Sequence, residues 1–132
     1  MGSAAWKRPV LAIVLASGLG TVSVPAMAAG DGAAEYRARC ASCHGQNGAG
    51  DGPAAAALRS RPSDLRMLAK SNDGVFPVKI LQTVIDGRKT IRAHGNFEMP
   101  VWGRALSQGE GDGEAAKRIA AIIDYLQSIQ LK

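Results

Sequence analysis

The sequence predicts an all-α fold in which helices are joined by long loops. Three segments, at about residues 33–43, 77–86 and 113–129, place apolar residues at the spacing of one helix face. The segments between them are rich in glycine, and no run alternates apolar and polar residues as a half-buried strand does. No internal repeat is visible, so we expect one domain.

Residues with capping preferences mark the ends of the three expected helices. Asp31 is the expected N-cap of the first helix, and Glu35 lies in its first turn, where the helix dipole favours an acid. Pro77 suits the first position of the second helix, and Gly87 suits the residue after its end. Asp112 is the expected cap of the third helix.

The third helix carries the clearest apolar stripe. Its apolar residues recur every three or four positions, so we expect this face to pack in the core. They are Ala115, Ile119, Ile122, Leu126 and Ile129, with Ile123 and Tyr125 widening the stripe. A shorter turn is expected over residues 63–69, with Ser63 as its N-cap and Leu65 and Leu68 facing inward.

Cys40-Ala41-Ser42-Cys43-His44 is the most informative segment of the chain. The pattern Cys-x-x-Cys-His is the attachment site of c-type haem. A spacing of three puts both sulfurs on one side of a helical turn, where the two thiols add to the two vinyl groups of haem. The sequence therefore predicts one covalent haem c with His44 as an axial iron ligand and Gly45 ending the helix.

Three other chemistries use two cysteines at this spacing. A dithiol of the thioredoxin type usually lies between a strand and a helix, and no strand-like run precedes Cys40. A zinc site needs four ligands, which this chain supplies only if His44 and His94 join Cys40 and Cys43. A disulfide that closes so short a loop stabilises a fold little. Haem attachment is therefore the favoured interpretation.

The N-terminal segment has the pattern of a secretory signal peptide. Lys7 and Arg8 precede an apolar stretch over residues 9–25, and Ala26-Met27-Ala28 is a small-residue cleavage pattern. We therefore expect residues 1–28 to be a signal peptide, residues 29–132 to form the mature domain, and the protein to be exported to the periplasm. An uncleaved signal anchor is the alternative, although the stretch is short for a membrane span.

The charge balance is only mildly basic. The full chain has 16 Lys and Arg against 11 Asp and Glu, and loss of Lys7 and Arg8 with the leader would reduce the excess further. The basic residues are scattered and aromatic residues are few, which argues against nucleic-acid binding. A weakly basic face toward an acidic redox partner is compatible with this composition.

The second axial ligand has three candidates beyond the leader. Met99 is favoured because it follows the second helix in a loop, far from His44 in sequence, and Pro100 stiffens the backbone after it. Met67 is interpreted as a core residue of the short turn. His94, in the same loop as Met99, is the other candidate to replace it.

The chain resembles the small soluble class I cytochromes c of the bacterial periplasm over nearly all of residues 29–132. Three motifs and the end of the final helix carry the resemblance. They are Cys40-x-x-Cys43-His44, Gly50-Asp51-Gly52-Pro53, Met99-Pro100-Val101-Trp102-Gly103 and Tyr125-Leu126. The resemblance implies a mono-haem class I fold of three main helices with short turns and long loops around the haem, and His44 and Met99 as the axial pair.

The resemblance also implies roles for the surroundings of the haem. Pro53 is similar to the proline whose carbonyl accepts the Nδ1 proton of the ligating histidine, a bond that orients the imidazole. Trp102 is similar to a residue close to a haem propionate. Arg59 and Arg61 are candidates to neutralise the propionates, and the alternative for each is a solvated surface side chain.

A further pair of positions matches residues with structural roles in the family. Gly32 and Tyr36 resemble the glycine and the aromatic residue of the N-terminal helix that cross the C-terminal helix, here near Ile122 and Tyr125. This similarity implies a contact between the two helices and no chemistry.

The expected function is one-electron transfer, without enzymatic activity and without a small-molecule substrate at the iron. Its partners would be redox proteins: a periplasmic dehydrogenase, a respiratory complex or a terminal oxidase. Two alternatives remain. In the first, the bond between Met99 and the iron is labile, and the protein is a haem peroxidase or gas sensor. In the second, the protein is a dedicated electron-accepting subunit of a periplasmic dehydrogenase, because the segment over residues 84–99 resembles cytochromes of that kind, those of sulfite dehydrogenase among them.

Overall fold

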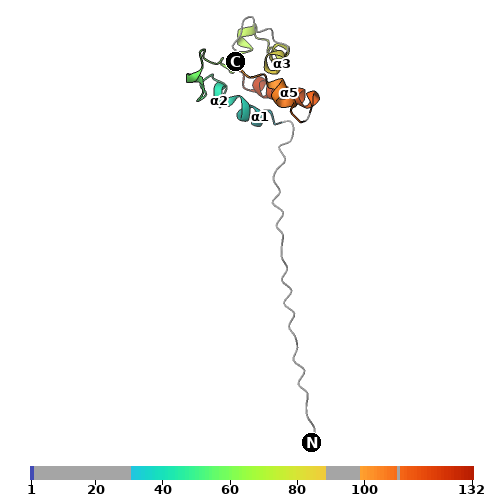
Figure 1. Ribbon diagram of the computed structural model, residues 1–132. Helices are drawn as coiled ribbons and strands as arrows, with labels where there is room; N and C mark the ends of the chain where they lie inside the picture. The colour runs from blue at the N-terminus through green and yellow to red at the C-terminus, as the bar shows by residue number, and fades with distance from the viewer. Residues whose placement is uncertain (2–30, 89–98, 110) are drawn as a thin grey trace.

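The computed structural model describes residues 1, 31–88, 99–109 and 111–132. Within these residues the chain forms helices and short 3-10 turns and no strand, which confirms the expected all-α fold (Figure 1). The α-helices are α1 (Gly32–Arg39), α2 (Ala41–His44), α3 (Val78–Asp86), α4 (Trp102–Ser107) and α5 (Asp112–Ser128), and the 3-10 turns are η1 (Ala55–Ala57), η2 (Leu65–Met67) and η3 (Lys70–Asn72).

Helices α1 and α5 cross in close contact (Figure 1). A Cβ on Gly32 would lie 1.8 Å from the carbonyl oxygen of Ala121, so the helices approach this closely only because residue 32 has no side chain. The rings of Tyr36 and Tyr125 pack beside this point with their centroids 5.0 Å apart. The contact expected near Ile122 and Tyr125 is thereby confirmed.

Helix α5 is the centre of the core, because it packs against α1, α3 and α4. Its predicted stripe is confirmed: Ile119, Ile122 and Leu126 are buried, and Ile129 is half-buried against the same core. The full set of described buried apolar residues is Tyr36, Ala41, Leu81, Ile85, Leu106, Ala115, Ile119, Ile122, Ile123 and Leu126.

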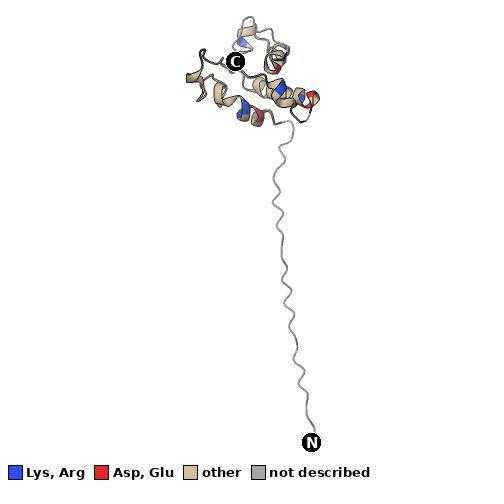
Figure 2. Ribbon diagram, in the orientation of Figure 1, with Lys and Arg blue, Asp and Glu red and all other residues tan. Residues whose placement is uncertain are grey.

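An ion-pair cluster also joins α1 to α5. Glu35 lies between Arg39, at 2.8 Å, and Arg118, at 2.7 Å, and its own side chain is only 16% exposed. Burial alone would raise the pKa of Glu35, but hydrogen bonds from the two guanidinium groups outweigh it and lower the pKa. Both signs of charge occur along the two helices (Figure 2).

The helix ends follow the sequence expectations with small displacements. The carboxylate of Asp31 accepts a hydrogen bond from the N–H of Ala34 at 3.0 Å, so its capping role is confirmed. Gly87 ends α3 with a φ of +69°. Pro77 is the N-cap of α3 and not its first residue, and Asp112 begins α5 after an N-cap at Gly111.

Two other local features differ from the sequence expectations. The turn over residues 63–69 is capped by Asp64, whose carboxylate accepts from the N–H of Arg66, and not by Ser63. Helix α4 was not expected, because its six residues are too few to show an apolar period and begin with Trp102-Gly103, two poor helix formers.

The expected signal peptide falls on residues 1–28, nearly all of which lie outside the described residues, as does His94. In the part of the chain that the structure describes, no helix has both the length and the apolar character needed to span a bilayer.

Candidate haem site

The Cys-x-x-Cys-His motif lies on a nearly continuous helical path from α1 into α2. The N–H of Cys40 donates to the carbonyl of Tyr36 at 2.8 Å, and the N–H of His44 donates to the carbonyl of Cys40 at 2.9 Å. A helical turn therefore connects Cys40 to His44, as the sequence predicts for residues 33–43, with a break in regular geometry only at Cys40. Gly45 ends this path with a φ of +81°.

Cys40 and Cys43 carry free, half-buried thiols. Burial raises the pKa of the Cys40 thiol to about 11, more than the neighbouring Arg39 lowers it. A thiol with this pKa stays protonated at neutral pH, whereas the attacking cysteine of a redox dithiol has a lowered pKa. In addition, helix α1 precedes the motif where a thioredoxin-like site would have a strand.

The imidazole of His44 meets a different carbonyl from the one expected. Its Nδ1 lies 3.1 Å from the carbonyl oxygen of Ser63, so the assignment of this role to Pro53 was wrong. The reason is that the backbone on both sides of Pro53 is bound to the motif helix: Gly52 N–H donates to the carbonyl of Cys43, and Ala54 N–H donates to that of Ser42. Pro53 is therefore tied to α2 and is exposed.

The segment that carries Ser63 is held from two sides. On one side, the N–H of Leu65 donates to the carbonyl of Gly48 at 2.7 Å. On the other, the side-chain amide of Gln130 donates to the carbonyl of Leu65 and accepts from the N–H of Ala69. Gln130 was not recognised from the sequence, because a polar residue just after an apolar stripe gives no signal of a contact with residues 65–69.

Residues 45–52 fold back onto the motif helix. The N–H of Gly50 donates to the carbonyl of His44 at 2.8 Å, and the buried hydroxyl of Tyr36 donates to the carbonyl of Gly45 at 2.7 Å. A Cβ on Gly52 would lie 2.4 Å from the carbonyl oxygen of Ser42. The loop therefore approaches the backbone of α2 this closely only because residue 52 has no side chain.

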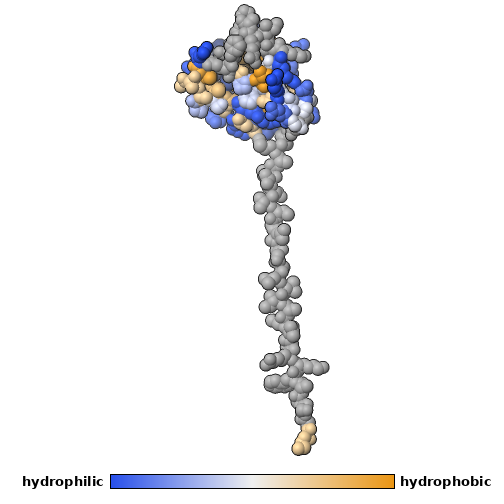
Figure 3. All heavy atoms as spheres, viewed as in Figure 1, coloured by the Kyte–Doolittle hydropathy of each residue, from blue (hydrophilic) through white to orange (hydrophobic). Residues whose placement is uncertain are grey.

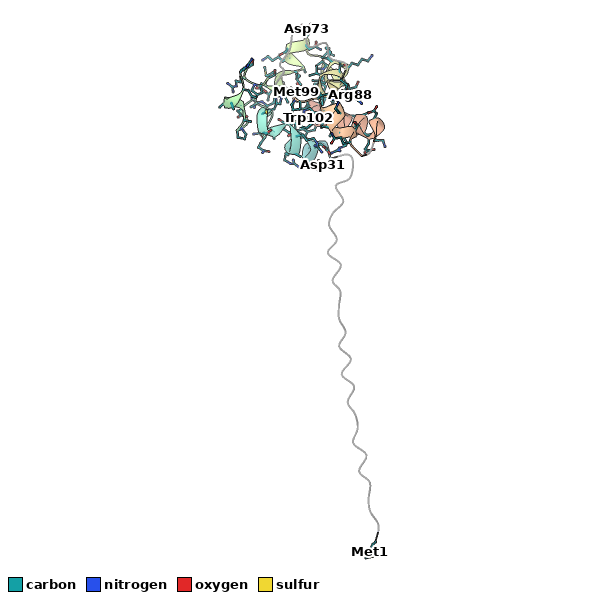
Figure 4. All side chains as sticks on the ribbon, viewed as in Figure 1. Met1, Asp31, Asp73, Arg88, Met99 and Trp102 are labelled. Carbon is teal, nitrogen blue, oxygen red and sulfur yellow. The ribbon has the colours of Figure 1, made fainter. Side chains whose placement is uncertain are left out.

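Met99 is far from the Cys-x-x-Cys-His motif in the sequence but packs against the same core. It is half-buried and, like Cys40 and Trp102, packs against the buried cluster. Figure 4 labels Met99 in the middle of the domain with Trp102 close by, and Figure 3 shows apolar atoms exposed in the middle of this face within a mostly hydrophilic surface. Met67, by contrast, is half-buried in η2 and lies outside the set of described residues that pack on the core, which Leu65 and Leu68 join as expected.

The three residues expected near the propionates have different surroundings. Trp102 is the first residue of α4 and is half-buried. Arg59 and Arg61 are exposed, and Nε of Arg61 donates to the carbonyl of Gly50 at 3.4 Å. Their roles toward propionates stay predictions.

The donor set suits a covalent haem c. Two thiols one helical turn apart, an imidazole whose Nδ1 faces a carbonyl, and a thioether packed on the same core are the kinds of group that two thioether bonds and two axial ligands require. A tetrahedral zinc site would need His94, which lies outside the described residues.

Comparison with known families supports the same assignment. Residues 27–126 match the family model described as cytochrome c oxidase, cbb3-type, subunit III. Comparisons with curated proteins and with solved structures gave no match. Because the family match covers most of the chain and includes both cysteines and the helical domain, the chain belongs to this family and is a mono-haem class I cytochrome c domain with haem c as its cofactor.

Proposed function

We propose that this protein is a periplasmic one-electron carrier whose haem iron is held between His44 and Met99. The observation that carries the proposal is that Cys40, in the attachment motif, and Met99, from a loop some 60 residues later, both pack against one core. Packing on one core from two distant parts of the chain supports the proposal that the motif and the thioether hold the same haem.

The hydrogen bond of His44 selects the form of the imidazole that binds iron. The carbonyl of Ser63 only accepts hydrogen bonds, so Nδ1 carries the proton and the lone pair of Nε2 is available as a ligand. The same bond orients the ring.

Met99 would complete the coordination. When bound, haem supplies an iron that changes between Fe(III) and Fe(II), and a thioether ligand stabilises Fe(II) and raises the reduction potential. With both axial positions filled by the protein, no position is open to a substrate, which agrees with an electron-carrying role for the family.

Export and partner choice complete the proposal. The leader-like residues 1–28 support a periplasmic location, where haem attachment to such motifs takes place. The partners are redox proteins with which the exposed haem edge makes small, transient contacts. The description of the family model supports a respiratory oxidase among them, beside a periplasmic dehydrogenase or another respiratory complex.

The test is the visible spectrum of the purified ferric and ferrous protein, matured with the haem-attachment machinery, before and after addition of carbon monoxide, cyanide or peroxide. A carrier with two strong axial ligands gives low-spin spectra that these additions leave unchanged. A rapid shift on addition of carbon monoxide or peroxide would contradict the proposal and favour the peroxidase or gas-sensor alternative.

A further inference from the structure

A fork of hydrogen bonds lies at the C-terminal end of α3. The guanidinium of Arg88 binds the carboxylate of Asp86 through two nitrogens, with Nε at 2.9 Å and a terminal nitrogen at 2.7 Å. The backbone N–H of Arg88 donates to the same carboxylate at 3.1 Å. A second terminal nitrogen of Arg88 binds Asp112, the first residue of α5.

This fork lies directly against the segment that follows Met99. A Cβ on Gly103 would lie 2.6 Å from the carboxyl carbon of Asp86 and 2.7 Å from Nε of Arg88. The first turn of α4 thus packs its backbone onto the ion pair. Beside it, a Cβ on Gly87 would lie 3.3 Å from Cα of Val101, so the end of α3 also contacts the residue two positions after Met99.

These contacts lie two and four residues after Met99 in the chain. Only Pro100 separates Met99 from Val101, and proline restricts the backbone on both of its sides. Residues 101 and 103 pack against residues 86–88, so a change in the geometry of the fork would reach Met99 through a short and restricted stretch of backbone.

We propose that Asp86 and Arg88 are positioning residues for Met99, which hold the first turn of α4 so that the thioether stays at the iron. This inference rests on the proposed axial role of Met99. It assigns a task to an exposed ion pair that contributes little to stability in most proteins.

The experiment compares Arg88→Met and Asp86→Asn with Lys117→Met in the full-length holoprotein. Lys117 forms an exposed ion pair with Glu114 on α5, so its substitution is a matched control for loss of surface charge. The readouts are the methionine-to-ferric charge-transfer band and the affinity of the ferric protein for imidazole, which competes with the thioether. Thermal unfolding is recorded in parallel.

We expect both fork variants to have a weaker charge-transfer band and to bind imidazole about fivefold or more tightly, because a competitor binds the fraction of molecules in which the thioether is detached. Lys117→Met should match the wild type in both readouts. Asp86→Asn preserves side-chain shape, so it provides the test if Arg88→Met fails to mature.

Two results separate the failure of this inference from the failure of the proposed function. If Met99→Ala abolishes the band but both fork variants keep wild-type band intensity and imidazole affinity, the positioning role is wrong and axial ligation by Met99 stands. If the band persists in Met99→Ala, the proposed ligand is wrong and the positioning role falls with it. Equal changes in Lys117→Met would also overturn the positioning role.

Discussion

The two proposed axial ligands are held by different kinds of bond. On the His44 side, carbonyl groups and N–H groups of the main chain make most contacts: Ser63 to the imidazole, Gly50 to the carbonyl of His44, and Gly52 to that of Cys43. On the Met99 side, the atoms nearest to a Cβ placed on Gly103, in the first turn of the following helix, belong to the side chains of Asp86 and Arg88. Main-chain groups thus make the closest described contacts around His44, whereas side chains make those at Gly103, four residues after Met99.

This difference predicts that side-chain substitutions affect the two ligands differently. Backbone hydrogen bonds survive exchange of exposed side chains, so the imidazole should keep its orientation in many variants. A contact made by two side chains can be weakened by one substitution. We therefore expect single substitutions to weaken binding of the thioether more readily than binding of the imidazole. The following predictions address this contrast, beginning with the attachment on which both sides depend.

The largest effect is expected from Cys40→Ser combined with Cys43→Ser. Removal of both thiols removes both thioether bonds, so no haem should remain with the polypeptide in acidified acetone. The measurement is the absorbance of the precipitated protein at the Soret maximum, with Ser42→Ala as the control within the motif. Pigment retained by the double variant would contradict covalent attachment at these positions.

The same exchange, glycine to alanine, probes both sides directly. In Gly52→Ala the new methyl group meets carbonyl oxygens of Ser42 and Ala41 at 2.4 and 2.6 Å, and backbone cannot move aside easily. We expect a loss of about 3 kcal/mol in the free energy of unfolding. In Gly103→Ala the neighbours are side chains, which can rotate, and we expect about 1 kcal/mol or less, with a weaker charge-transfer band.

Gly113→Ala in α5 is the matched control, because nothing lies within 4 Å of the added methyl group. Alanine is the better helix former, so this variant should gain up to about 1 kcal/mol. Denaturant unfolding of the three holoproteins measures the series. Equal losses in Gly52→Ala and Gly103→Ala would show that the two sides do not differ.

Glu35→Gln should cost about 1.5 kcal/mol at neutral pH, because it removes the charge that both Arg39 and Arg118 bind. The pKa of Glu35 is lowered in the folded protein, so its stabilisation is fully present above its ordinary value of 4.5 and is lost as the pH falls through the lowered pKa. The difference in unfolding free energy between wild type and variant should therefore shrink below pH 4.5. Glu114→Gln, in the exposed pair with Lys117, is the control and should cost less than about 0.5 kcal/mol. If the difference in unfolding free energy between wild type and Glu35→Gln does not change with pH, the ionised Glu35 carboxylate is not the source of this stabilisation.

Tyr36→Phe should cost about 1 kcal/mol, because it removes the hydrogen bond to the carbonyl of Gly45 and keeps the ring. That carbonyl retains the N–H of Gly48 as a donor at 3.2 Å. The charge-transfer band should not change, since the hydroxyl supports the His44 side. Loss of the band in Tyr36→Phe would mean that the two sides are coupled.

Local patterns predicted the part of the fold that depends on neighbours in sequence. The stripe of α5, the cap at Asp31 and the helix end at Gly87 all arise from residues within one or two turns, and the structure has them. The haem motif belongs to the same class, because five consecutive residues define it.

Contacts between distant segments were not predictable in the same way. The carbonyl that meets His44 comes from Ser63, and any residue type supplies a carbonyl, so the sequence contains no signal for it; the resemblance pointed to Pro53 instead. Likewise, the contact of Gly103 with the side chains of Asp86 and Arg88 depends on how α3 packs against α4.

The decisive measurement is the ferric visible spectrum of Met99→Ala beside those of the wild type, Met67→Ala and His94→Ala. If His44 and Met99 are the axial pair, the methionine-to-ferric charge-transfer band is present in the wild type and in the two control variants and is missing only in Met99→Ala. A band that persists in Met99→Ala, or that is absent from the wild type, would contradict the ligation proposed for this cytochrome.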